Sequence, residues 1–121
     1  MPQTASDPRR SYANAPRLPD TTPLDLRDLF LSENRSSLPV VELEIGCARG
    51  GFLLERLATE PAVYLVGLEI QRKAATLAAE KVDKMGHASR CRVFSEDARD
   101  VLPRLAAESV RRVFLHFPDP W

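Results

Sequence analysis

The residues best suited to chemistry follow four short apolar runs of the chain. A glycine-rich segment at residues 46–51 comes after the first run, and Glu69, Asp97 and Asp119 come after the second, third and fourth. Glycines allow a backbone to approach a ligand closely, and a helix that begins beyond such a turn presents unpaired N–H groups. A carboxylate at the end of the following strand can accept hydrogen bonds from ribose hydroxyls. The pattern therefore favours a ligand that contains a nucleoside.

The glycine spacing narrows the class of ligand. Gly46, Gly50 and Gly51 bracket a turn that also contains Ala48. The Gly-x-Gly-x-x-Gly pattern of dinucleotide sites is not met, because Ala48 replaces the middle glycine. A nicotinamide-binding domain is therefore disfavoured. A plain tight turn of an α/β protein is compatible with the same residues.

Two other carboxylates are candidates on weaker grounds. Asp97, which precedes Ala98, suits contact with the exocyclic amine of an adenine, and it suits a turn or helix cap equally well. Asp119 lies between Pro118 and Pro120, which restrict the backbone on both of its sides. Such restriction suits a preorganised site, although a plain proline turn has the same composition.

The elements that must position these residues alternate along the chain. The apolar and β-branched runs predict strands, and the apolar residues at helical spacing predict helices between them. Strand, helix, strand and helix in alternation predict a parallel sheet with right-handed crossovers, whose ligand lies at the carboxyl ends of the strands. The predicted strands are residues 40–45, 62–70, 91–94 and 110–117, and the predicted helices are 24–31, 52–58, 71–85 and 101–107, the last with Asp100 as its N-cap.

Composition excludes several classes of protein. The 121 residues are 44% hydrophobic, which suits one small globular domain, and 17 basic residues balance 17 acidic ones. This balance excludes a strongly basic arm or an acidic tail within the chain. Cys47 and Cys91 belong to no cysteine or histidine cluster, so neither a metal site nor a disulfide framework is expected. No apolar run approaches the length of a membrane span, and no secretory signal is visible, so we expect a cytoplasmic protein.

Four motifs, taken in order, resemble the bacterial tRNA (guanine-N7-)-methyltransferase family. They are residues 43–46 (Leu-Glu-Ile-Gly), 67–70 (Gly-Leu-Glu-Ile), 97–98 (Asp-Ala) and 117–121 (Phe-Pro-Asp-Pro-Trp), of which the last is the most specific. The resemblance covers roughly residues 40–121 and only the N-terminal part of the family. It implies a Rossmann-like class I methyltransferase fold, with a mostly parallel sheet and flanking helices, truncated after the fourth strand. Residues 1–39 would be a partly flexible N-terminal extension, and residues 40–121 the S-adenosylmethionine-binding half of the domain.

The resemblance also implies a reaction and its residues. The cofactor is S-adenosylmethionine, the partner is tRNA, and a methyl group passes to N7 of a guanine, with no metal and no membrane involved. Asp119 would be the catalytic residue. The cofactor-binding residues would be Glu44, Gly46, Gly50, Glu69, Asp97 and Asp119.

The chain departs from the family pattern at two places. Ala48 stands where a glycine is usual, and the chain ends at Trp121, where the family continues. We therefore expect an incomplete, weakly active or inactive fragment, with an exposed fourth strand open to self-association. Two other readings stay open: a methyltransferase that acts on another substrate, and a nonenzymatic module that binds the cofactor or a protein partner. His116 is expected to pack against the sheet rather than to line the site.

Overall fold

The computed structural model describes residues 11–31 and 37–116, so Asp119 and the rest of residues 117–121 lie outside the described chain. Its centre is a four-stranded sheet with the order β3-β2-β1-β4 and every neighbouring pair parallel. The strands are β1 (Val41–Ile45), β2 (Tyr64–Glu69), β3 (Cys91–Ser95) and β4 (Arg112–Leu115). This topology confirms the predicted parallel α/β sheet with crossover helices.

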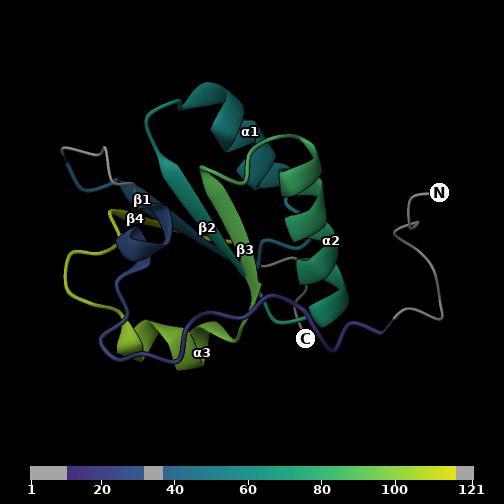
Figure 1. The fold of residues 1–121 in the computed structure, drawn as a ribbon, viewed down its shortest axis with the longest axis horizontal. Coiled ribbons are helices and arrows are strands. Elements are labelled where there is room, and N and C mark those ends of the chain that lie inside the picture. The colour runs from purple at the N-terminus through teal and green to yellow at the C-terminus, as the bar shows by residue number, and fades with distance from the viewer. Residues whose placement is uncertain (1–10, 32–36, 117–121) are drawn as a thin grey trace.

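Helices cover both faces of the sheet (Figure 1). Helices α1 (Gly51–Thr59) and α2 (Arg72–Lys84) lie on one side, and the short α3 (Ala98–Val101) lies on the other. A 3-10 turn, η2 (Leu102–Arg104), continues α3, and a second one, η1 (Leu26–Phe30), precedes the sheet. Among residues 11–31 and 37–116, no helix is long and apolar enough to cross a bilayer.

Two helix predictions are corrected by the structure. The helix predicted at residues 24–31 is the 3-10 turn η1, which Asp25 caps by accepting a hydrogen bond from the Arg27 N–H. The helix predicted at 101–107 starts earlier, because Asp97 rather than Asp100 is its N-cap. Asp97 accepts from the Arg99 N–H, and a short polar side chain in that position satisfies one of the unpaired N–H groups of a first turn.

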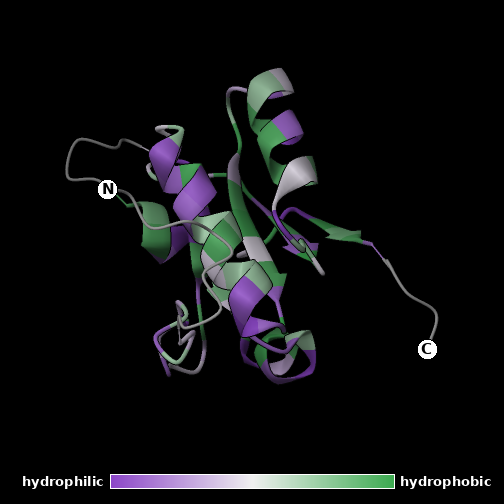
Figure 2. Cartoon of the chain, turned by 90° about the vertical axis from the view of Figure 1, so that its right-hand side faces the viewer, coloured by the Kyte–Doolittle hydropathy of each residue, from purple (hydrophilic) through white to green (hydrophobic). Residues whose placement is uncertain are grey.

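The side chains of the strands divide into two apolar layers. Val41, Leu43, Val66 and Leu68 pack with η1 and Val101, whereas the layer beneath α1 and α2 contains Leu53, Leu57, Leu65, Ala75, Ala78, Val82 and Val93. Figure 2 shows mostly apolar strands in the middle, flanked by helices on which apolar and polar residues alternate. The alternation follows from the two-residue period of a strand, which sends successive side chains to opposite faces.

Residues 11–31 pack against the domain. The Pro16 carbonyl accepts from the Ser95 N–H at the end of β3, and Glu96 accepts from both the Leu18 N–H and the Arg17 guanidinium. Farther on, Leu24 forms a parallel bridge with Leu105 beyond η2. The segment thus runs from the end of β3 along α3 and into the apolar layer, as its purple-to-blue trace in Figure 1 shows.

The strand β4 lies at the edge of the described sheet, as the sequence predicted. Its pairing partner is β1, and Val113 and Leu115 are 50% and 52% exposed on the face that carries α3 and η1 elsewhere. Apolar side chains beside unpaired backbone groups favour association with another chain or segment. Self-association through this strand therefore stays a prediction.

A buried ion pair joins β1 to α1. Glu42 is 2% exposed, and both of its carboxylate oxygens accept from Arg56, at 2.8 and 2.9 Å. The Arg56 guanidinium also lies 5.2 Å from the centre of the Phe114 ring on β4. One arginine therefore compensates a charge within the sheet and ties together β1, α1 and β4.

Replacing Arg56 by methionine should lower the free energy of unfolding by about 3 kcal/mol, because the buried Glu42 carboxylate would lose both of its hydrogen bonds from Arg56 and keep the half-exposed Arg112, 4.0 Å away, as a weaker cationic neighbour. Urea denaturation followed by circular dichroism measures the change. The matched control is Arg99→Met, since Arg99 makes a similar fork to Asp97 but is 86% exposed, and we expect a loss below about 1 kcal/mol. Equal losses for the two variants would contradict the central role of the buried pair.

Candidate functional site

The carboxyl ends of β1, β2 and β3 bring together most of the residues predicted from the sequence. Register places Ile45 beside Leu68 and Glu69 beside Ser95, so the segments that follow the three strands start at one edge of the sheet. There the N–H groups of Gly46 and Cys47 both donate to the Leu68 carbonyl, at 2.8 and 3.2 Å. This pairing extends the sheet into the glycine loop and anchors the start of that loop.

The loop is a left-handed turn in front of α1. Gly46 and Gly50 have φ values of 77° and 89°, and Ala48, between them, has a φ of 49°. Gly50 is the N-cap of α1 and donates its N–H to the Cys47 carbonyl at 2.9 Å. Ala48 thus adopts a conformation that glycine enters without penalty and a residue with a Cβ enters at a cost of about 1–2 kcal/mol. At this position an alanine thus adopts a backbone conformation that is more common for glycine.

The Glu69 carboxylate connects two of the loops. Its Oε1 accepts from the Ala48 N–H at 2.8 Å, and its Oε2 accepts from the N–H of Gln71, the N-cap of α2, at 3.0 Å. The residue is 9% exposed. A carboxylate has about four acceptor positions, so each oxygen retains capacity for one more donor, such as a ribose hydroxyl.

Glu44 is more deeply buried than Glu69, at 2% exposure against 9%. Its Oε2 lies 2.6 Å from Nδ1 of His116, and its Oε1 has no hydrogen-bond partner among the described residues. Burial raises the pKa of the Glu44 carboxyl group, and the hydrogen bond from His116 opposes that rise. A buried polar atom without a partner marks a place where a bound molecule or an ordered water completes the hydrogen bonding.

The role of His116 in this site was not predicted from the sequence. Its ring lies 4.7 Å from that of Phe52 at the start of α1, and its Nδ1 lies within hydrogen-bond distance of the Glu44 carboxylate, so it lines the site. The available signal was alternation: Arg112, Phe114 and His116 share one face of a strand that neighbours β1. Which strand would lie beside the first one could not be read from that periodicity.

Asp97 is at the same edge but already has partners. Arg99 donates to its carboxylate from both the main chain and the guanidinium, and these bonds hold the pKa of Asp97 below its usual range. The cap function is therefore the one the geometry displays. A contact between Asp97 and an adenine stays a prediction, as does the role of Asp119, which lies outside the described residues.

Neither the Cys47 thiol in the glycine loop nor the Cys91 thiol at the start of β3 is suited to act as a nucleophile. Cys47 and Cys91 are both buried, and burial raises the pKa of each thiol, that of Cys91 to about 12. A thiol of that kind is not a nucleophile at neutral pH, because the thiolate is the reactive form. No group of three or more potential metal ligands occurs within the described parts of the chain.

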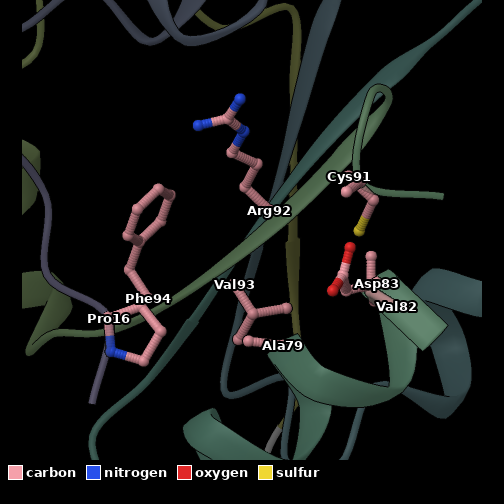
Figure 3. A pocket seen from close by; sticks show the side chains of 9 residues that line it. Pro16, Ala79, Val82, Asp83, Cys91, Arg92, Val93 and Phe94 are labelled. Atoms are coloured by element: carbon pink, nitrogen blue, oxygen red, sulfur yellow. The ribbon is translucent and has the colours of Figure 1, made fainter. Parts of the chain in front are cut away.

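A hollow of about 230 Å³ lies away from this edge, between α2 and the outer side of β3. Figure 3 shows its lining, with Pro16 and Phe94 at one end and Cys91 beside Asp83 at the other. The lining is mostly apolar and contains none of the residues predicted for the site. Hence the candidate site is the strand-end edge and not this hollow.

The sequence is similar to those of known methyltransferases. The model of a family described as "Putative methyltransferase" matches residues 39–121. A tRNA (guanine-N(7)-)-methyltransferase of Anaeromyxobacter dehalogenans is 46% identical over 82 residues, which are 67% of this chain and 40% of that protein. One from a Jannaschia species is 33% identical over 103 residues, which are 85% of this chain and 40% of that protein. The chain thus spans about 40% of the length of these relatives.

A solved structure supports the fold alone. The bifunctional kinase-methyltransferase WbdD superposes with a TM-score of 0.54 and 20% identity, over 62% of this chain and 16% of that one. At that identity the likeness concerns the arrangement of the strands and helices. It agrees with the Rossmann-like sheet seen here.

Adding a methyl group at Gly46 should damage the site more than the same change at Gly86. A Cβ on Gly46 would lie 2.9 Å from the His116 carbonyl oxygen, whereas nothing lies within 4 Å of one on Gly86, and both residues have positive φ. We expect Gly86→Ala to cost about 1 kcal/mol of stability and Gly46→Ala about 3 kcal/mol. Urea denaturation of both variants measures this, and equal costs would contradict the packing of the loop on His116.

Glu44 should make stability depend on pH in a defined direction. A carboxyl group whose pKa is raised on folding binds its proton more tightly in the folded state, so stability falls as the pH rises through the raised pKa. We expect Glu44→Gln to lose this fall. The measurement is urea denaturation of both proteins from pH 4.5 to 8, and the stability of the variant relative to the wild type should increase with pH. If the stability of the variant relative to the wild type stayed constant or decreased with pH, folding would not raise the pKa of Glu44.

Proposed function

This chain belongs to the methyltransferase family whose model it matches, and on that basis we propose that it binds S-adenosylmethionine at the carboxyl ends of β1, β2 and β3. The observation that carries the proposal is the Glu69 carboxylate, which is locked against the glycine loop and the start of α2. Its two oxygens are held by main-chain N–H groups, so a ribose diol would meet a carboxylate that needs no rearrangement.

The other residues at this edge fit the remainder of such a ligand. Gly46 and Gly50 keep the loop free of side chains, and Glu44 retains a buried oxygen that lacks a donor. The amino group of the methionine part, or a water that it holds, would supply that donor. Asp97 would lie toward the adenine. Residues 40–121 would then be the cofactor-binding half of the domain, with residues 11–31 packed along it.

We further propose that the substrate is a guanine in tRNA, methylated at N7. The support is that the relatives that the chain matches are named tRNA (guanine-N(7)-)-methyltransferases. Because the chain spans about 40% of their length, the activity, the substrate and the partner of the whole protein are carried over as a proposal.

This reaction requires little acid–base catalysis by the protein. Guanine N7 has a lone pair and no proton, so no general base is needed before attack. S-Adenosylmethionine, when bound, supplies a methyl group on a positively charged sulfur. Transfer of this methyl group to N7 would form an N–C bond in place of the C–S bond and would leave positive charge on the purine. The protein must align the reacting atoms, and the Asp119 carboxylate would orient the purine and stabilise its growing charge.

The cofactor proposal is tested by calorimetric titration of the chain with S-adenosylhomocysteine, with NAD as the control ligand. We expect binding of the former only, and a loss of about tenfold or more in affinity for Glu69→Gln, because a neutral amide accepts less strongly from hydroxyl donors. The matched control is Glu55→Gln on the exposed face of α1, which should bind as the wild type does. Binding of NAD alone, or an unchanged affinity in Glu69→Gln, would refute the proposal.

The substrate proposal is tested by transfer of tritiated methyl groups to tRNA transcripts. We expect transfer to an ordinary transcript, at a lower rate than the Anaeromyxobacter relative shows, and none to a transcript in which 7-deazaguanine replaces guanine. Asp119→Asn should lower the rate by about 100-fold, because the negative charge that would stabilise the cationic purine is lost. Transfer to the 7-deazaguanine transcript would exclude N7 as the acceptor.

A further inference from the structure

We propose that His116 is a positioning residue for this site: its Nδ1–H holds the Glu44 carboxylate beneath the glycine loop and thereby sets how tightly the chain binds an S-adenosyl ligand. The inference rests on the proposed function, since it concerns the same site. It adds a residue that neither the glycine loop nor the acidic motifs include.

The position of His116 is determined from three directions. Its main-chain N–H donates to the Ile45 carbonyl at 3.3 Å, which continues the pairing of β4 with β1. Its ring packs 4.7 Å from the ring of Phe52 at the start of α1. Its carbonyl oxygen lies under Gly46, where any Cβ would be 2.9 Å away. The residue therefore contacts the strand, the helix and the loop that together form the site.

The contact with Glu44 is short and specific. Nδ1 of His116 and Oε2 of Glu44 are 2.6 Å apart, a separation typical of a hydrogen bond strengthened by charge. Glu44 is buried, whereas the His116 side chain is 46% exposed. The histidine thus stands between a buried carboxylate and solvent, and it fixes one carboxylate oxygen while the other remains without a partner.

The other charged groups around Glu44 make this bond important. Glu69, from the end of β2, disfavours ionisation of Glu44, and so does burial. The thiols of Cys47 and Cys91 are neutral because burial raises the pKa of both. Arg56, the cation that α1 directs at this face of β1, is occupied by Glu42. His116 is therefore the partner that favours the charged form of Glu44, the form that attracts a cationic amine.

The first test compares S-adenosylhomocysteine affinity in two variants of the 121-residue chain. His116→Phe keeps the ring packing on Phe52 and removes the donor, and we expect about a tenfold weaker affinity at pH 7.5. His116→Asn keeps a donor near the place of Nδ1, and we expect it to recover to within about threefold of the wild type. The loss in His116→Phe should also begin at a higher pH than in the wild type, because Glu44 would take up a proton more readily.

A double-mutant cycle separates positioning from a merely structural role. If His116 acts through Glu44, then His116→Phe should cost nothing further in a Glu44→Gln background. An equal loss in both backgrounds would overturn the proposal, and so would an Asn variant that binds as weakly as the Phe variant. Thermal denaturation of each variant checks that all of them are folded.

A ligand-free measurement keeps this inference distinct from the proposed function. Nitrogen-15 NMR of the His116 ring should show the proton on Nδ1 in the wild type and a shift toward Nε2 in Glu44→Ala. A folded wild type that binds no S-adenosylhomocysteine would refute the cofactor proposal, and with it the effect on affinity. A wild-type ring that carries no proton on Nδ1 would refute the hold of His116 on Glu44, whatever the chain binds.

Discussion

Two carboxylates buried on one face of β1 each require a hydrogen-bonding partner from another element of the fold. Glu42 and Glu44 are each 2% exposed, and an unpaired charge in such a place would cost several kcal/mol. Arg56 from α1 partners the first and His116 from the end of β4 partners the second. The helix and the neighbouring strand must therefore lie where their side chains reach β1. These contacts join α1 and β4 to β1 in addition to the apolar packing beneath α1.

The two carboxylates differ in how completely their oxygens are hydrogen-bonded. Glu42 has both oxygens matched by one guanidinium, which is the arrangement of a structural ion pair. Glu44 has one oxygen matched and one buried without a donor, and burial disfavours its charge. A site held in readiness for a ligand commonly carries such a local cost. Within β1, the hydrogen bonding of Glu42 is therefore complete, whereas that of Glu44 is incomplete among the described residues.

The edges of the described sheet also differ. At β3, residues 11–31 supply a cover, since Pro16 bonds to Ser95 and the Arg17 side chain reaches Glu96. At β4, Val113 and Leu115 remain half exposed. The β3 edge of the described sheet is therefore covered by another segment, whereas apolar side chains of β4 stay partly exposed.

Much of this protein was determined by the sequence alone. The alternating apolar runs predicted all four strands and their parallel arrangement, because strand and helix periods are local properties. The glycines at 46 and 50 predicted the turn, because glycine enters left-handed backbone conformations without penalty. The positions of Glu69 and Asp97 after strands followed from the same periods, whereas Glu44 was implied by the family resemblance. Tertiary structure alone decided which groups these carboxylates contact. Asp97 caps α3, Glu69 binds the N–H groups of Ala48 and Gln71, and His116 reaches Glu44, because these pairings depend on strand order and register, which bring together residues far apart in the chain.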